Sequence, residues 1–252
     1  MIFVNLLHLL LDVIRLYIKQ KEVKMQTIYI SPSDFAFLYT ESKWGFYQKY
    51  RQGIKRPPFS MPKIFNVIDA LIKKNYENVD ISTIDKNLPT GRITHSDSWI
   101  KCKPIRNPDY PNIEVSINGK IDSILTREDG AAVIDFKTCD VEPTLNKKYA
   151  LQLNAYAYGI LNPFKDGLAL DNINQLGLIV FSPSEFSVNY NSTAALKGAF
   201  KWIELDFDPI GFENFIREEV IPLLAGPEPK PEANEPYWNY LKQLGVEFVE
   251  EG

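Results

Sequence analysis

Two acidic residues and one lysine occupy positions from which they could act on the same substrate atom. Asp135 and Lys137 stand two residues apart in an apolar stretch, and Asp122 precedes Asp135 by thirteen residues. In a strand, Asp135 and Lys137 share one face, while Ile134 and Phe136 point to the opposite, core-facing side. The two carboxylates on this face could hold a hard divalent cation, which would polarise a phosphodiester and lower the pKa of a water molecule.

The turn between these residues decides whether Asp122 joins that face. A two-residue turn centred on Asp129–Gly130 places Asp122 opposite Lys137, and one centred on Glu128–Asp129 places it opposite Asp135. Both registers bring the three side chains together at roughly 5–8 Å, whereas a three-residue loop would turn Asp122 to the other face. Facing carboxylates repel, which raises the pKa of one of them unless a cation is bound. Lys137 would supply a positive charge beside the phosphate and could help position or deprotonate the water.

A helix is predicted over residues 146–161, because Gly and Pro are lacking until Gly159 and Pro163 follows its end. Gln152 and Tyr156 are four residues apart on this helix and therefore share a face. Their amide and hydroxyl groups could contact a nucleic-acid backbone or order the neighbouring site.

Three runs together resemble the PD-(D/E)XK nuclease superfamily, and most closely its RecB-like exonuclease branch, which includes CRISPR-associated exonucleases of that type. These runs are Gly119–Asp122, Val133–Thr138 and Gln152–Tyr156, and the branch pattern is G-x-h-D, h-h-D-h-K-T and Q-x-x-x-Y, with h an apolar residue. The resemblance implies a Mg²⁺- or Mn²⁺-dependent enzyme acting on DNA. It also implies that Asp122 and Asp135 are metal ligands, that Lys137 is catalytic, and that Gln152 and Tyr156 are an accessory pair.

The chain departs from this pattern in two places. Many relatives have a metal-binding His on an early helix, but neither His8 nor His95 fits that position. Asp69 is the predicted replacement, ahead of Asn66 and Glu114. Iron–sulfur relatives carry three cysteines near the C-terminus, whereas this chain has two cysteines in all, Cys102 and Cys139, so no cluster is expected.

A basic segment near the N-terminal side could contact DNA. It contains Lys43, Lys49, Arg51, Lys55 and Arg56, with no acid between them, interleaved with four aromatic residues. Lysine and arginine side chains can contact the phosphates of a nucleic-acid strand, and aromatic rings can stack on its nucleobases. Together with Lys120 and Lys147 they form the predicted nucleic-acid-binding set; the alternative is an amphipathic helix whose aromatic side is core and whose lysines and arginines face water.

The remaining elements must position these residues. Helices are expected from Ser31–Ser33 to Tyr50, from Pro62 to Tyr76 and over 210–220, and strands over 113–125, 131–138, 175–181 and 199–207. This order predicts an α/β (α+β) fold with a restriction-endonuclease-like core, in which helices flank a mixed central sheet. We expect residues 1–24 to be an amphipathic helix or extension, 25–226 the nuclease domain and 227–252 a Pro-rich acidic tail.

Composition sets the broad class. The chain has 252 residues, 45% of them hydrophobic and 24% charged, and a net charge of −4, which argues against a strongly basic DNA-coating protein. No phosphate-binding G-x-x-x-x-G-K-[ST] motif occurs. Residues 2–18 are apolar with one polar stripe, which favours a helix docked on the body over attachment to a membrane surface; Met25 is an alternative start. We expect a cytoplasmic protein.

The sequence therefore favours a metal-dependent nuclease that hydrolyses DNA phosphodiester bonds, exonuclease-like on ends or single strands, in repair, recombination or defence. One alternative is a catalytically silent nucleic-acid-binding module of the same fold. Another is a partner-docking domain that uses residues 1–24. A helicase or defence-system partner cannot be named from the sequence.

Overall fold

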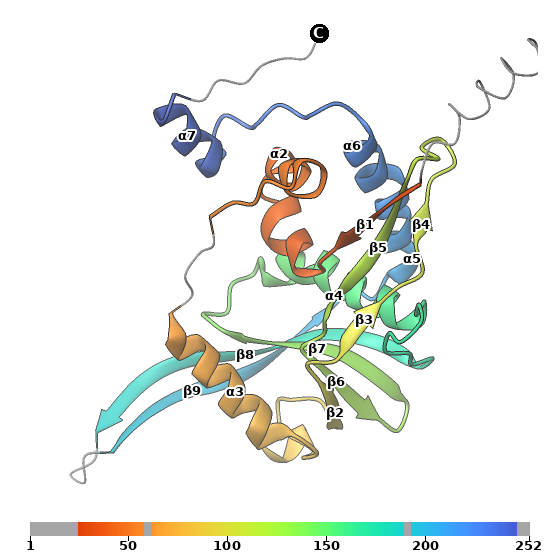
Figure 1. The fold of residues 1–252 in the computed structure, drawn as a ribbon. Helices are drawn as coiled ribbons and strands as arrows, with labels where there is room; N and C mark the ends of the chain where they lie inside the picture. The colour runs from red at the N-terminus through yellow and green to blue at the C-terminus, as the bar shows by residue number, and fades with distance from the viewer. Residues whose placement is uncertain (1–24, 58–61, 189–192, 246–252) are drawn as a thin grey trace, which may run out of the picture.

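The computed structural model describes residues 25–57, 62–188 and 193–245 (Figure 1). Two mixed sheets form its framework. In the first, β5 (Ile113–Lys120) pairs in parallel with β1 (Gln26–Ile30) and antiparallel with β3 (Trp99–Lys101) and β4 (Ile105–Arg106). The second has the order β2-β6-β7-β8-β9, which comprises Arg92–Ser96, Ser123–Arg127, Gly130–Thr138, Ile173–Val188 and Ala194–Leu205. Mixed sheets flanked by helices confirm the predicted restriction-endonuclease-like fold class.

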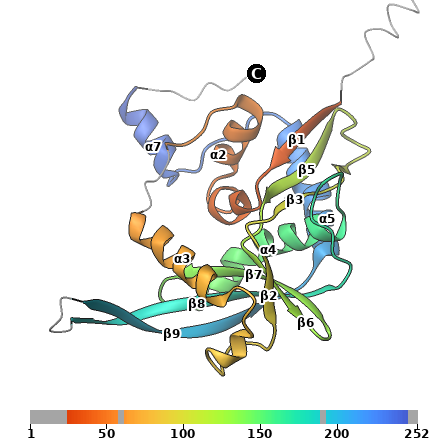
Figure 2. The same cartoon turned by 60° about the horizontal axis from the view of Figure 1, so that its bottom comes forward.

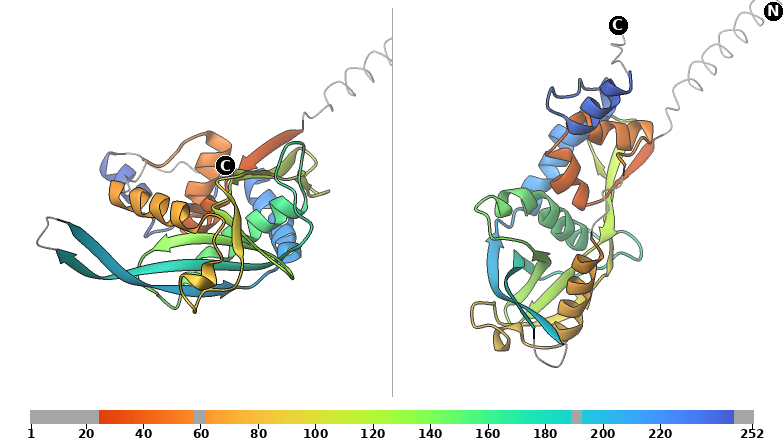
Figure 3. Two further views of the ribbon diagram at one scale, coloured as in Figure 1. Left: turned by 90° about the horizontal axis from the view of Figure 1, so that it is seen from below. Right: turned by 90° about the vertical axis from the view of Figure 1, so that its left-hand side faces the viewer.

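Helices cover these sheets from several sides (Figure 2). The α-helices are α2 (Lys43–Tyr47), α3 (Lys63–Tyr76), α4 (Leu145–Leu161), α5 (Pro209–Phe215), α6 (Ile221–Ala225) and α7 (Pro236–Gln243). Shorter segments are the π-helical η1 (Phe35–Tyr39), η2 (Gln48–Gln52) and η4 (Ile216–Val220), and the 3₁₀ turn η3 (Ile81–Thr83). The β8–β9 ribbon extends past the helices (Figure 3).

Strand β7 is buried on both faces, which the sequence did not predict. Val133 belongs to the larger core cluster together with residues of α4, whereas Ile134 and Phe136 belong to a second cluster with Tyr76 of α3. Both neighbours of β7 are strands, and β8 runs parallel to it. A central strand with helices on both sides has a nearly continuous apolar sequence, so polar groups appear only at its carboxyl end. Asp135 and Lys137 lie there.

The strand expected over residues 113–125 is two strands in two different sheets. β5 ends at Lys120 in the first sheet and β6 begins at Ser123 in the second. Between them Ile121 is fully buried, and its N–H donates to the Ser98 carbonyl at 2.9 Å. Asp122 therefore stands at the junction through which the chain passes from one sheet to the other.

Other boundaries also differ from the prediction. The helix expected from Ser31 to Tyr50 is interrupted, because the Ser42 hydroxyl accepts the Gly45 N–H at 2.8 Å and begins α2 anew. Strands β8 and β9 are longer than expected, and β1, β2 and α7 were not predicted. Residues 1–24, with the predicted apolar helix, lie outside the described residues.

In the part of the chain that the structure describes, none of the helices combines the length and hydropathy that crossing a membrane requires.

Asn154 fixes α4 to the segment that follows β9. Its amide nitrogen donates to the carbonyls of Ala150 and Asp206, at 3.0 Å each, and its oxygen accepts the Asp208 N–H at 2.8 Å. Asn154→Ala removes the side chain that bonds the Asp206 carbonyl and the Asp208 N–H, so we expect a loss of about 1–3 kcal/mol in the free energy of unfolding, measured by denaturant titration. Asn75→Ala removes one local bond on exposed α3 and should cost about 0.5 kcal/mol or less. Equal losses in both variants would contradict the role of Asn154.

Candidate active site

The three residues singled out from the sequence meet in one cavity of about 400 Å³ between α3 and the carboxyl end of β7. In the β6–β7 hairpin Ser123 pairs with Ile134, which is the register of a turn centred on Glu128–Asp129. This register is the one in which Asp122 faces Asp135. The residues that line the cavity are Phe37, Phe65, Asn66, Asp69, Ile72, Asp122, Asp135, Phe136, Lys137, Thr138, Cys139 and Tyr149.

Asp135 is the most enclosed charged group of this cavity, with 5% of its surface exposed. Its Oδ1 accepts a hydrogen bond from Gln152 Nε2 at 3.2 Å, and its Oδ2 forms an ion pair with Lys137. Burial raises the pKa of Asp135, and the charge of Asp122 adds to this rise, while Lys137 opposes it. An additional cation beside Asp135 would relieve both unfavourable effects.

Asp122 is held from two directions. Its Oδ2 accepts the backbone N–H of Phe136 at 2.7 Å, which ties the sheet junction to β7. Its Oδ1 pairs with the ammonium group of Lys73 on α3. Lys73 also lies 3.1 Å from a carboxylate oxygen of Asp69 and 3.5 Å from one of Asp97. The ammonium group of Lys73 therefore stands among three carboxylates.

Lys73 is a residue that the sequence analysis missed. The available signal was its position four residues after Asp69, which places both on one face of α3. Its approach to Asp122 could not be read from that spacing, because it depends on how α3 packs on the sheet. Asp69, the predicted third metal ligand, lines the cavity, but it is linked to Asp122 through the ammonium group of Lys73.

Lys137 lies between a carboxylate and an aromatic ring. Its Nζ pairs with Asp135 and is 4.7 Å from the centre of the Tyr149 ring. Burial by itself lowers the pKa of Lys137, but the Asp135 charge outweighs it and the pKa is raised. Lys137 thus keeps its proton at neutral pH and suits the role of a fixed positive charge better than that of a base. Tyr149 precedes Gln152 by one helical turn and was also missed.

The accessory pair occupies the buried side of α4. Gln152 and Tyr156 are 3% and 6% exposed. Gln152 donates a hydrogen bond to Asp135. Burial raises the pKa of the Tyr156 hydroxyl, and the negative charge of Asp135 raises it further. Both residues are thus positioned to order the site from within the core and not to meet a substrate at the surface.

The donor set suits a hard cation. Asp122 and Asp135 offer carboxylate oxygens, and the buried Gln152 Oε1 has no hydrogen-bond partner among the described residues. Magnesium is commonly held by one or two carboxylates, with water and substrate oxygens completing its shell. Within residues 25–57, 62–188 and 193–245, no group of three His, Cys, Asp or Glu side chains is arranged to hold a metal ion. Two carboxylates therefore fit Mg²⁺ or Mn²⁺, provided that Lys73 moves away from Asp122.

The weaker candidates for a third ligand differ in position. Asn66 lines the cavity. Glu114 instead accepts hydrogen bonds from Thr27 at 2.6 Å and from Arg106 at 2.8 Å, in the first sheet.

The predicted basic segment does not form one surface. Arg56 pairs with Glu41 and Glu235, and the Lys43 ammonium lies over the Tyr39 ring, where burial lowers its pKa to about 8. Arg51 donates to the side chain of Gln26 at 2.7 Å. These three residues thus contact other parts of the protein, including β1 and the start of α7.

Three other basic residues converge. Lys49, Lys55 and Lys120 line one hollow beside β5, although Lys49 is also paired with Asp34. Lys147 is exposed in the first turn of α4.

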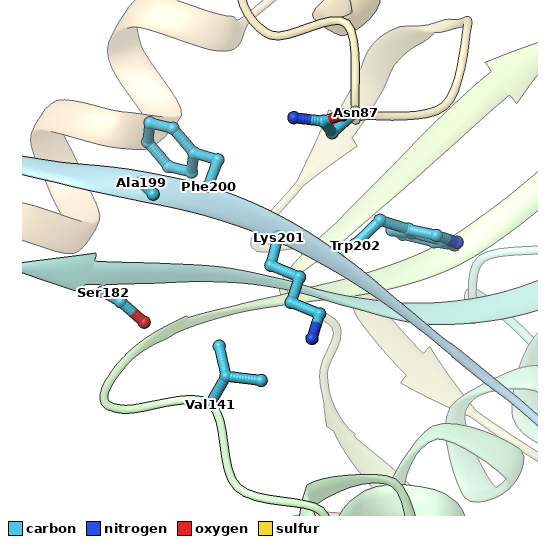
Figure 4. Close-up of a pocket in the computed structure, with 7 residues that line it drawn as sticks. All are labelled: Asn87, Val141, Ser182, Ala199, Phe200, Lys201 and Trp202. Carbon is cyan, nitrogen blue, oxygen red and sulfur yellow. The ribbon is translucent and has the colours of Figure 1, made fainter.

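A further hollow, of about 530 Å³, lies along β9 (Figure 4). In that view Phe200 and Trp202 point to one side of β9 and Lys201 to the other. The hollow is therefore lined from both faces of this edge strand. Its seven lining residues include one charged side chain, Lys201, and no carboxylate. It lacks the groups that metal-assisted hydrolysis needs.

Comparison with known proteins identifies the family of this chain. The family model of the PD-(D/E)XK nuclease superfamily matches residues 38–203, and the chain belongs to this superfamily. Among solved structures it is similar to the crystal structure of SSO0001, with 14% identity, a TM-score of 0.41, and coverage of 94% of this chain and 92% of that one. No curated protein sequence matches it.

Lys73 should compete with a divalent cation for Asp122. Lys73→Met leaves the partly buried Asp122 without its counter-charge, so in chelator we expect a loss of about 1–3 kcal/mol in the free energy of unfolding. Mg²⁺ should then raise the melting temperature of this variant more than that of the wild type, because no ammonium group has to be displaced. Thermal unfolding with and without Mg²⁺ measures both effects.

Lys74→Met is the matched control, since Lys74 is exposed on the same helix and is outside the cavity. A Lys73→Met protein that gains no more from Mg²⁺ than the Lys74→Met protein would show that the cation does not bind at Asp122.

Proposed function

We propose that this protein is a metal-dependent nuclease that hydrolyses DNA phosphodiester bonds, with water as the nucleophile. The observation that carries the proposal is the meeting of Asp122, Asp135 and Lys137 in one cavity, with Gln152 bonded to Asp135 from the core side. Membership of the superfamily supports hydrolase chemistry on nucleic acid.

Each residue then has a defined task. Asp122 and Asp135 would hold Mg²⁺ or Mn²⁺; the bound ion supplies Lewis acidity and lowers the pKa of a water molecule. Gln152 fixes the orientation of Asp135. Lys137, kept protonated by its partner, stabilises the negative charge that builds on the phosphate oxygens during in-line attack. Tyr149 and Tyr156 exclude water from the rear of the site.

The finer assignment rests on the sequence pattern. The Gln-x-x-x-Tyr spacing on α4 and the Gly-x-x-Asp run that ends at Asp122 favour the RecB-like branch. We infer an exonuclease-like activity on DNA ends or single strands, in repair, recombination or defence, carried by residues 25–226 in the cytoplasm. A helicase or another nucleic-acid-processing protein would suit such a nuclease as partner.

One observation favours the alternative of a catalytically silent binding module. Lys73 already neutralises Asp122, and Asp69 is held by the same lysine. If a divalent cation does not displace this ammonium group, the fold would bind DNA without cutting it.

Replacing Asp135 or Lys137 distinguishes an active nuclease from a silent DNA-binding module. Asp135→Asn removes a carboxylate that would hold the metal ion, and Lys137→Met removes the positive charge beside the phosphate, so for each we expect at least about a hundred-fold lower rate of DNA cleavage. The rate is measured on end-labelled single- and double-stranded DNA in Mg²⁺, in Mn²⁺ and in chelator. The wild type should cleave with either metal and stop in chelator.

Asp129→Asn is the control, because Asp129 is an exposed carboxylate on the same hairpin. It should cleave like the wild type. An Asp135→Asn protein that still cuts would rule out this site, and a folded wild type that binds DNA but cuts with neither metal would establish the silent module.

A further inference from the structure

A hollow of about 590 Å³ lies where β1, β3 and β5 of the first sheet meet the end of η2. These three strands lie side by side in Figure 1. The residues that line the hollow are Tyr29, Ser31, Lys49, Tyr50, Lys55, Trp99, Asn118, Gly119 and Lys120. The set combines aromatic and basic side chains and includes no acid. It shares no residue with the candidate active site.

Two aromatic rings of this hollow face solvent. Trp99 is 61% exposed and Tyr29 is 50% exposed, although aromatic residues of this size usually bury most of their surface. Neither ring fills a gap in the core. The ammonium group of Lys101 lies 5.4 Å from the centre of the Tyr29 ring, which brings a further positive charge to the same surface.

The charge of the hollow is available to a ligand. Lys55 and Lys120 are exposed, and in the described part of the chain neither has an ion-pair partner. Lys49 is neutralised by Asp34. Two free ammonium groups beside two exposed rings complement a ligand that carries both negative charge and flat apolar surface.

The same pair of chain segments carries the hollow and the active site. Trp99 is paired with Lys120 across β3 and β5, and two residues earlier the Asp97 N–H donates to the Asp122 carbonyl at 3.1 Å. Along each of these segments the hollow and Asp122 are thus two residues apart, so one strand of several nucleotides could reach both.

We propose that this hollow binds an unpaired segment of a DNA strand, whose bases stack on Trp99 and Tyr29 and whose phosphates contact Lys55 and Lys120. The proposal rests on the proposed nuclease function and names its substrate as DNA with unpaired nucleotides. Bases within a duplex are already stacked on both sides, so they can use Trp99 only after unstacking. An unpaired base has a free face, and its stacking on an aromatic side chain tolerates any sequence.

The test separates stacking from charge. Binding of a fluorescein-labelled oligothymidine is measured by anisotropy in chelator, where cleavage cannot interfere. A strand of equal length made of abasic sites has the same phosphates but no bases. Wild-type protein should bind oligothymidine more tightly than both the abasic strand and a duplex.

Trp99→Ala should weaken binding of oligothymidine by about 5- to 100-fold, the effect of one lost base stack, and leave binding of the abasic strand unchanged. Trp99→Phe should keep most of the affinity. Tyr240→Ala, at a ring that is 54% exposed on α7, is the control and should bind like the wild type. Lys120→Ala should weaken binding of both strands and reduce the salt slope by about 0.7.

Oligothymidine affinity that is unchanged in a folded Trp99→Ala protein would overturn the proposal, and so would equal loss for the abasic strand. The outcome does not depend on catalysis. If the protein cleaves DNA in Mg²⁺ but its oligothymidine affinity does not depend on Trp99, it lacks this stacking site and remains a nuclease. A protein that stacks bases on Trp99 in chelator but never cleaves has the stacking site and lacks the proposed activity.

Discussion

A carboxylate inside a protein must be met by positive charge or hydrogen-bond donors, and the burial of Asp135 imposes this condition on the whole site. The donors come from different elements: Lys137 from β7 itself and Gln152 from α4. Asp122, which adds a second negative charge nearby, is held by the Phe136 N–H and by Lys73 of α3. Satisfying two acids thus fixes how α3, α4 and the junction of the two sheets lie around β7.

This balance of charge also bears on the proposed chemistry. Asp122 and Asp135 with Lys73 and Lys137 sum to zero, and Asp69 and Asp97 beside Lys73 bring the sum for this region to −2. Entry of a divalent cation and a phosphodiester changes that sum, and Lys73 is the partner that can leave, because Asp69 and Asp97 remain close to it. Lys137 has no such alternative among these acids and stays beside the reacting phosphate. The two lysines therefore have different tasks, although each neutralises one acid.

The sequence was informative where a local pattern determines geometry. Alternation along β7 and a two-residue turn predicted that Asp122, Asp135 and Lys137 share one face, and helical spacing predicted that Gln152 and Tyr156 share a face of α4. Contacts between distant segments could not be predicted in this way. Lys73 reaches Asp122 because of how α3 packs, and Arg56 is neutralised by Glu235, which lies 179 residues further along the chain. The basic segment consequently looked like one surface although tertiary pairing divides it.

In the proposed mechanism Asp122 and Asp135 share one divalent cation. Crystals grown with Mn²⁺ test it most directly, because anomalous scattering locates the ion without reference to activity. We expect a single peak at roughly 2.0–2.3 Å from oxygens of both carboxylates, with the Lys73 ammonium displaced toward Asp69 and Asp97. A map with no peak between the two acids, and with the Lys73–Asp122 ion pair intact at saturating Mn²⁺, would contradict it.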